Sequence, residues 1–105
     1  MFDVEAIIAI VERGKADKLV DIAKKAGATG ATIFYARGTS YAEAKKLFNL
    51  NIEASKEAIL ILSEREKSQP IIDALCEAGR LREPGTGIIF TMPITKVVGL
   101  HHRED

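Results

Sequence analysis

The stretch Val4-Glu5-Ala6-Ile7-Ile8-Ala9-Ile10-Val11 is almost continuously apolar. A half-exposed strand would alternate polar and apolar residues, so this run predicts a strand that is buried on both faces. A second run, Ala58-Ile59-Leu60-Ile61-Leu62 within residues 57–64, has the same character. The two runs therefore predict two strands that carry apolar side chains on both faces of a sheet.

Each of these apolar strands is followed by a predicted amphipathic helix. Residues 15–26 and residues 68–79 both repeat apolar side chains at spacings of three and four. Both segments end in Ala-Gly, at Ala26-Gly27 and Ala78-Gly79, and glycine commonly terminates a helix. Ser68 is a candidate cap for the second helix. Further strands are expected at residues 29–36 and 88–92, with a short fifth strand at residues 94–100.

The order of these segments is strand, helix, strand, loop, strand, helix, strand, which is a doubled βαβ pattern. It predicts an α+β fold, a ferredoxin-like βαββαβ sandwich in which two helices cover one face of an antiparallel sheet. Two helices leave the other face of that sheet uncovered, although the central strands are apolar on both faces. We therefore expect another copy of the chain to cover the open face, in a homo-oligomer.

Length and composition limit the kinds of protein that are possible. The chain has 105 residues, enough for a single domain spanning residues 1–105. Its 15 basic and 15 acidic residues give no net charge, which argues against nucleic acid as the main partner. No apolar run has the length of a membrane span, and the first residues lack the pattern of a signal peptide. Cys76 is the single cysteine, which fits a reducing compartment, and we expect a cytoplasmic protein.

Residues 38–55 are the least regular part of the sequence. Ser40 could cap a short helix over residues 41–48, and Asn49, Asn51 and Ser55 suit a loop. A connection of this length in a small domain is usually functional or mobile. Leu47 and Phe48 would be a partner-binding anchor if exposed, or simple packing if they fold back.

A glycine-containing turn precedes the last predicted strand, in Arg80-Leu81-Arg82-Glu83-Pro84-Gly85-Thr86-Gly87-Ile88-Ile89-Phe90. Glycines let backbone N–H groups converge on an anion such as a phosphate. The alternative is a tight turn that needs glycine for its geometry alone. Neither of the two common glycine-rich phosphate-binding motifs matches this spacing.

Taken together, these segments resemble the P-II (nitrogen-regulatory) signalling family. Glu5-Ala6-Ile7-Ile8 is similar to the family's first strand, and residues 27–32 fit its Gly-x-Thr-Gly-x-Thr pattern. Arg37-Gly38-Thr39 lies where the family's effector loop departs. Gly85-Thr86-Gly87-Ile88-Ile89-Phe90 resembles its Gly-x-Gly-Lys-Ile-Phe turn, and Lys96-Val97-Val98-Gly99-Leu100 resembles its closing strand.

The resemblance implies a homotrimer that binds ATP or ADP in clefts between subunits, often with 2-oxoglutarate. No obligatory cofactor is implied. The loop at 38–55 would dock on a regulated transporter or enzyme, as in the regulation of nitrogen utilisation. The implied ligand contacts are the adenine end at Ile7, Thr32, Gly38 and Ile61, the root of the loop at Arg37 and Thr39, and backbone groups at Gly85, Thr86 and Gly87 facing the phosphates.

Three positions that are basic in the family are Ile88, Gly99 and His101 here. A phosphate site with fewer cations should bind ATP more weakly, because charge-assisted hydrogen bonds are the strong ones. Replacement cations could come from elsewhere in the chain: Arg37, Arg80, Arg82, His102 or Arg103.

Two other kinds of protein remain as alternatives. One is a small metal-tolerance protein or enzyme on a ferredoxin-like trimer, since one fold hosts many functions; the other is a purely structural oligomer. The strands offer few acidic, basic or metal-ligating side chains. His101 and His102 are adjacent, so on a strand they would point to opposite faces and chelate a metal poorly. The sequence therefore predicts a non-enzymatic signalling protein with no catalytic or metal site.

Overall fold

The computed structural model describes residues 3–38 and 54–100. They form an α+β sandwich of the ferredoxin-like type, as predicted. Its elements are β1 (Val4–Glu12), α1 (Ala16–Lys25), β2 (Thr32–Gly38), β3 (Ala54–Glu64), a short 3-10 helix (Arg65–Lys67), α3 (Ser68–Gly79) and β4 (Gly87–Ile94).

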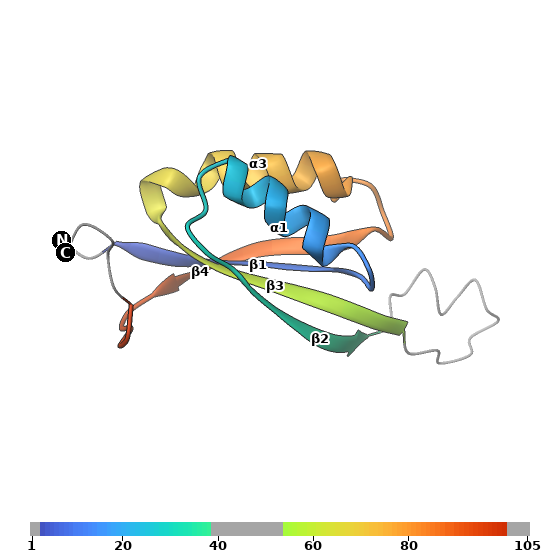
Figure 1. Cartoon of the computed structure of the whole chain (residues 1–105), viewed down its shortest axis with the longest axis horizontal. Coiled ribbons are helices and arrows are strands. Elements are labelled where there is room, and N and C mark those ends of the chain that lie inside the picture. The colour runs from blue at the N-terminus through green and yellow to red at the C-terminus, as the bar shows by residue number, and fades with distance from the viewer. Residues whose placement is uncertain (1–2, 39–53, 101–105) are drawn as a thin grey trace.

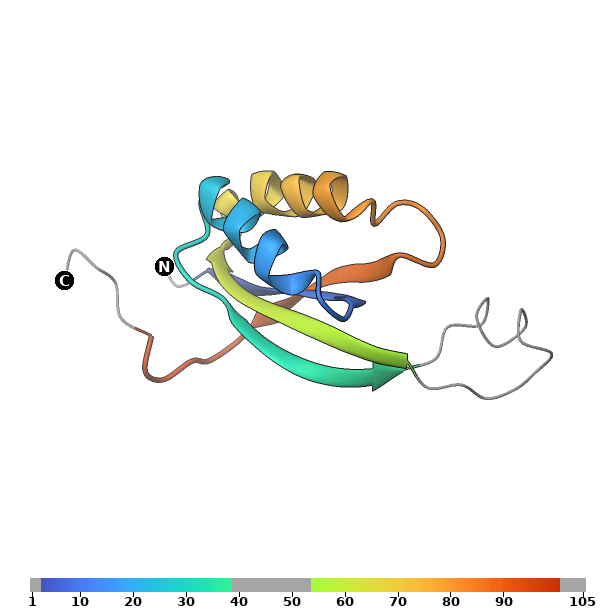
Figure 2. The same cartoon turned by 45° about the vertical axis from the view of Figure 1, so that its right-hand side comes forward.

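The four described strands form one antiparallel sheet in the order β2-β3-β1-β4. The two apolar strands, β1 and β3, are therefore central, and β2 and β4 are the edges. Figure 1 shows α1 and α3 on the same face of this sheet, and Figure 2 shows them side by side above it. In both views β2 and β3 extend past the helices at the end of the sheet where β2 stops.

The hydrophobic core lies between the helices and the sheet. Ile7 pairs with Ile61 across β1 and β3, and their side chains are fully buried beneath the helices. Ile71 and Leu75 of α3 complete this layer with Leu19 and Ala23 of α1. Burial of each large aliphatic side chain stabilises the fold by roughly 1.5–3 kcal/mol.

The open face of the sheet is also apolar. The residues that alternate with the core positions, such as Ile8 of β1 and Leu60 of β3, point to this face and are half-buried. Phe90 pairs with Ile8, and Phe34 lies on β2; both are exposed, as are Ile88 and Met92. An apolar surface of this extent is typical of an interaction site.

The two helices end with the same hydrogen-bond pattern but with different residues in the left-handed conformation. After α1 that residue is Gly27, with φ of 124°, as the sequence predicts. After α3 it is Arg80, with φ of 55°, rather than Gly79. A Cβ on Gly79 would lie only 3.2 Å from Leu81 Cγ, so this glycine makes room for a neighbouring side chain.

Several boundaries differ from the sequence-based prediction. β3 begins at Ala54 and β2 ends at Gly38, so the ends of the predicted loop at 38–55 are strand residues. β2 begins only at Thr32, where pairing with Leu60 starts. The prediction of a fifth strand was wrong, because residues 95–100 leave the sheet without pairing.

The expected cap of the second helix was also wrong. Ser68 is inside α3, and its Oγ donates a hydrogen bond of 3.2 Å to the carbonyl of Glu64. The helix predicted over 41–48 and the anchor residues Leu47 and Phe48 lie outside the described residues. Neither α1 nor α3 is long and apolar enough to cross a membrane.

Candidate functional site

The glycine-containing turn before β4 is a tight, internally bonded turn. Pro84 and Gly85 occupy its centre, and Gly85 has a φ of 83°, as the second central residue of a type II turn requires. The single O–H of Thr86 is shared between two carbonyl oxygens, those of Arg80 at 2.7 Å and Glu83 at 3.0 Å from Oγ1. The Thr86 hydroxyl therefore holds the turn together, and the backbone is what the turn offers to a ligand.

Gly87 has a packing role at the first position of β4. Its φ is 147°, and a Cβ at this position would lie 2.5 Å from the carbonyl oxygen of Ile10. No side chain fits at that distance, so glycine lets β4 approach β1 closely here. A substitution at Gly87 would disturb the sheet before it disturbed a ligand.

The glycine turn and the root of the predicted loop lie at the same end of the sheet. Gly87 pairs with Val11, Val11 with Glu57, and Glu57 with Tyr35, only two residues before Arg37. These positions are on opposite edges, about 14 Å apart across three strand spacings. A ligand lying across this end of the open face could therefore contact both residues 85–87 and Gly38. Thr39 lies outside the described residues.

Thr32 is at the other end of β2, about 20 Å from Gly38 at the usual rise per strand residue. It borders a hollow of about 710 Å³ between the α1–β2 connection and the far end of β3. Leu60 and Leu62 supply apolar side chains, residues 27–31 supply backbone and small side chains, and Leu100 closes one side. This composition, apolar with a few polar groups, is typical of a small-molecule site.

Ile7 and Ile61 are not available to a ligand. Both side chains are 0% exposed, because they point into the core beneath the helices. The expectation that these two side chains line an adenine site needs correction, because they point to the helix-facing side of the sheet. Leu60 and Leu62, which flank Ile61 in β3, point to the open face and line the hollow with Thr32. The period of two along a strand was the signal that could have identified these leucines.

The sequence and this structure were compared with known proteins. A family model described as "Nitrogen regulatory protein P-II" matches residues 4–104. The chain belongs to the P-II family. A crystal structure of Arabidopsis thaliana PII bound to citrate superposes with a TM-score of 0.69 and 22% sequence identity, covering 88% of this chain and 78% of that one. No curated protein matches.

Membership of the P-II family supports a regulatory signalling protein, and at the family level a regulator rather than an enzyme. Of the positions that are basic in the family, Ile88 is exposed on the open face and Gly99 has a φ of 96° in the segment after β4. His101, His102 and Arg103 lie outside the described residues.

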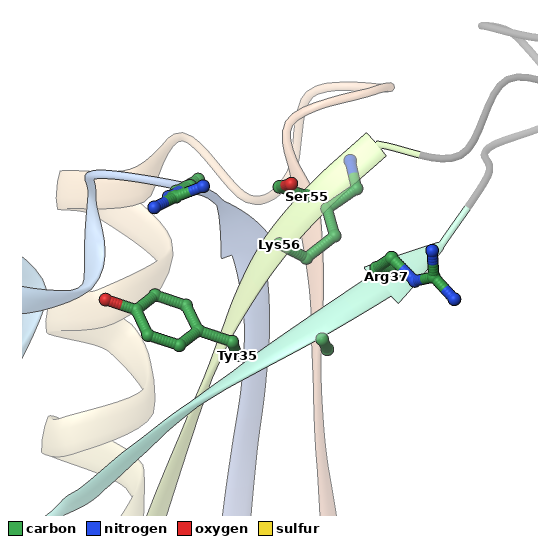
Figure 3. A pocket seen from close by; sticks show the side chains of 6 residues that line it. Tyr35, Arg37, Ser55 and Lys56 are labelled. Atoms are coloured by element: carbon green, nitrogen blue, oxygen red, sulfur yellow. The ribbon is translucent and has the colours of Figure 1, made fainter.

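Two of the proposed replacement cations in this P-II protein already have acidic partners. Arg80 Nε lies 3.1 Å from Glu83 Oε2, and Arg82 lies 3.6 Å from Asp73 Oδ1. Arg37 borders a separate hollow of about 360 Å³ at the end of β2, together with Tyr35, Ser55 and Lys56 (Figure 3). Arg37 thus borders a hollow, and it also has a contact of its own.

Metal-binding and thiol chemistry find little support in the described part of the chain. Within residues 3–38 and 54–100, no three His, Cys, Asp or Glu side chains gather into a group that could hold a metal ion. Cys76 is buried on α3 and adjoins Leu75 of the core. Its position fits packing, as the sequence predicts for a cysteine on the apolar stripe of a helix.

Proposed function

We propose that this P-II protein is a signalling protein that binds an adenine nucleotide, ATP or ADP, between the subunits of a homotrimer. Through the loop at 38–55 it would regulate a transporter or enzyme, in the manner of nitrogen-utilisation control. The observation that supports this most strongly is the separation of the ligand-binding elements. Thr32 is about 20 Å from Gly38 along β2, so one compact ligand does not reach both in the same subunit.

Two subunits together would resolve this separation. One subunit would supply the phosphate side, from the backbone of residues 85–87 and the end of β2 at Gly38. Its neighbour would supply the hollow that contains Thr32, Leu60 and Leu62, into which a planar base fits by apolar contact. The apolar open face supports the same association, because a second copy would cover it.

The position of Gly38 suggests how binding is transmitted. Gly38 is the last residue of β2, so a nucleotide at this point contacts the strand from which the loop departs. A ligand changes the loop only if it binds one state of the loop more tightly than another. The PII of Arabidopsis has been crystallised with citrate, and we propose that a small anionic effector acts with the nucleotide here as well.

Thermal unfolding with ATP, ADP and AMP tests the nucleotide proposal. A ligand that binds only the folded state at 100 times its dissociation constant adds about 2.7 kcal/mol to the free energy of unfolding. We expect a clear rise in melting temperature with ATP or ADP. An unchanged melting temperature with all three nucleotides at millimolar concentration would contradict the proposal.

Gly85 offers a matched pair of variants for the phosphate side. Its φ is positive, but no atom lies within 4 Å of a Cβ added there, so Asn and Asp both fit. Gly85→Asp places a negative charge beside the phosphates, whereas Gly85→Asn has nearly the same shape without the charge. We expect Gly85→Asp to abolish the ATP-dependent rise and Gly85→Asn to retain most of it. Equal responses would show that the phosphates bind elsewhere.

A further inference from the structure

A second hollow lies at the end of the sheet where β2 and β3 extend past the helices (Figures 1 and 2). Its volume is about 360 Å³, and its lining comes from three elements: Arg13 after β1, Tyr35, Ala36 and Arg37 of β2, and Ser55 and Lys56 of β3. Figure 3 shows Tyr35 and Arg37 on one strand beside Ser55 and Lys56 on the other. Three of the six side chains are cationic and none is acidic, in a chain with no net charge.

Arg13 is held at this hollow by an aromatic ring. Its guanidinium carbon lies 5.4 Å from the centre of the Tyr35 ring, which is the geometry of a cation–π contact. Such a contact orients the guanidinium but leaves its charge and its N–H donors available to an anion. Within residues 3–38 and 54–100, no carboxylate lies within ion-pair distance of Arg13.

The acidic residues next to this hollow are engaged elsewhere. Glu12 precedes Arg13, but its carboxylate lies 3.1 Å from the ammonium group of Lys15. Glu57 pairs with Tyr35 across the sheet, yet its carboxylate accepts hydrogen bonds from the backbone of Gly14 and Ala16. Neither carboxylate forms an ion pair with Arg13, although Glu57 keeps its negative charge because backbone N–H groups do not neutralise it.

We propose that this hollow binds a compact oxyanion with several negative charges, either a phosphate compound or a polycarboxylate, with Arg13 as its main contact. Arg37 and Lys56 also border the hollow but have contacts of their own, so the argument depends on Arg13. By strand register, Tyr35, Arg37 and Ser55 lie on the helix-facing side of the sheet, whereas Ala36 and Lys56 lie on the open face. The contacts with Arg13 and Tyr35 are thus on the face opposite the proposed nucleotide cleft, and the whole lining comes from one subunit.

Binding at this site would act on the root of the loop at 38–55. The anion would contact Arg13 in the turn after β1 and also Tyr35 and Arg37 near the end of β2, so it would connect these two segments. Gly38 follows Arg37 directly and is the residue at which β2 ends. An anion here would therefore restrain the strand end from which the loop departs, independently of a nucleotide.

Isothermal titration calorimetry of the assembled protein at constant ionic strength tests the site, with inorganic pyrophosphate and propane-1,2,3-tricarboxylate as separate probes. We expect saturable binding of at least one probe. Which probe binds shows whether the site takes a phosphate compound or a polycarboxylate. Arg13→Gln should weaken binding at least tenfold, and Tyr35→Leu should weaken it because the ring no longer orients Arg13. Arg82→Gln is the matched control, since it removes the same charge from another exposed arginine and should leave binding unchanged.

The nucleotide experiment provides a second control. Arg13→Gln should leave the ATP-dependent rise in melting temperature intact, and Gly85→Asp should leave binding of the probe intact. Circular dichroism confirms that each variant is folded. The site would be overturned by the absence of saturable binding for both probes, or by equal losses in Arg13→Gln and Arg82→Gln. Binding that survives Arg13→Gln but not Gly85→Asp would place the anion in the nucleotide cleft and also overturn it.

Discussion

At the scale of single residues, Glu57 shows how a strand stabilises a distant helix. Its Oε1 accepts hydrogen bonds from the N–H groups of Gly14 at 3.0 Å and Ala16 at 2.9 Å. The residue at the cap position of α1, Lys15, provides no side-chain cap of its own. The carboxylate therefore satisfies two otherwise unpaired donors and places a negative charge at the positive end of the helix dipole.

Removing this carboxylate should destabilise the fold. We expect Glu57→Ala to lower the free energy of unfolding by about 1–2 kcal/mol, which is typical for the loss of a helix cap. Glu57→Gln keeps an oxygen acceptor and loses only the charge, so its effect should be smaller. Urea unfolding at one fixed protein concentration measures both, with Glu77→Ala on the exposed face of α3 as the control. A loss in the Glu77 variant as large as that in Glu57→Ala would contradict this role.

The sequence predicted that residue 57 lies in a strand, but not this contact. The bonded residues are 41 and 43 positions apart, and they meet only after β3 is placed beside β1. Arg65 gives a second example: it contacts Asp3 at 2.8 Å and the buried Glu5 at 3.0 Å. Local pattern carries no information on such pairings, because the fold itself brings the partners together.

The Arg65 cluster should not make stability depend on pH near neutrality. The hydrogen bond to Asp3, together with the charges of Asp3 and Glu5, raises the pKa of Arg65 above its ordinary value. A raised pKa contributes stability that is complete below the unfolded-state value and is lost only as pH rises through the folded-state value. For an arginine both values lie far above neutral pH, so the guanidinium stays charged.

At the scale of elements, the end of α3 carries an unusual conformational cost. Leu81 N bonds to the carbonyl of Cys76 and Arg80 N to that of Glu77, which closes the helix through a left-handed residue. That residue is Arg80, and a side chain in this conformation costs roughly 1–2 kcal/mol relative to ordinary helical geometry. The glycine beside it, Gly79, is still helical, and its missing side chain leaves space for Leu81.

Arg80→Gly should therefore stabilise the protein. Glycine removes the conformational cost, while the exposed Arg80–Glu83 contact that is lost contributes little. After allowance for the greater freedom of glycine in the unfolded chain, we expect a gain of roughly 0.5–1 kcal/mol in the free energy of unfolding. Chemical denaturation measures it, and Gly27→Ala is the reciprocal control because it introduces a side chain at a positive φ. Stabilisation by Gly27→Ala, or destabilisation by Arg80→Gly, would show that this account is wrong.

Hydrophobic periodicity predicted the type and order of the four described strands and of α1 and α3, but it did not predict the 3-10 helix, and the fifth strand that it predicted was wrong. The two-sided apolar runs became the central strands β1 and β3, and the amphipathic segments became α1 and α3. The errors in the strand limits are errors of pairing. β3 extends back to Ala54 because Ser55 and Lys56 pair with Arg37 and Ala36, and residues 95–100 have no strand beside them with which to pair. Strand limits depend on partners that are remote in sequence, so local composition does not determine them.

At the scale of the whole molecule, the two faces of the sheet differ in how they are covered. One face is sealed by α1 and α3, whereas the other presents Phe34, Ile88, Phe90 and Met92 to solvent in the single chain. The sequence predicted this imbalance, since two helices do not cover both sides of strands that are apolar throughout. The residues of the candidate ligand site are also separated, with Thr32 at one end of the sheet and the glycine turn at the other. Both observations are explained if the functional unit contains more than one chain.

A charge on the open face tests this association directly. Phe90 is 39% exposed in the single chain, so Phe90→Lys leaves the core beneath the helices intact and places an ammonium group on the apolar face. Burial of that charge against a second copy would cost several kcal/mol, far more than the single chain would lose. We expect sedimentation to show dissociation to a smaller species whose circular dichroism retains its helical signal. Thr91→Lys is the matched control, because Thr91 is the next residue of β4, is exposed and points to the opposite side of the sheet. Association that survives Phe90→Lys unchanged, or that is lost equally in both variants, would mean that this face does not join the subunits, and the nucleotide cleft proposed between them would have to be placed elsewhere.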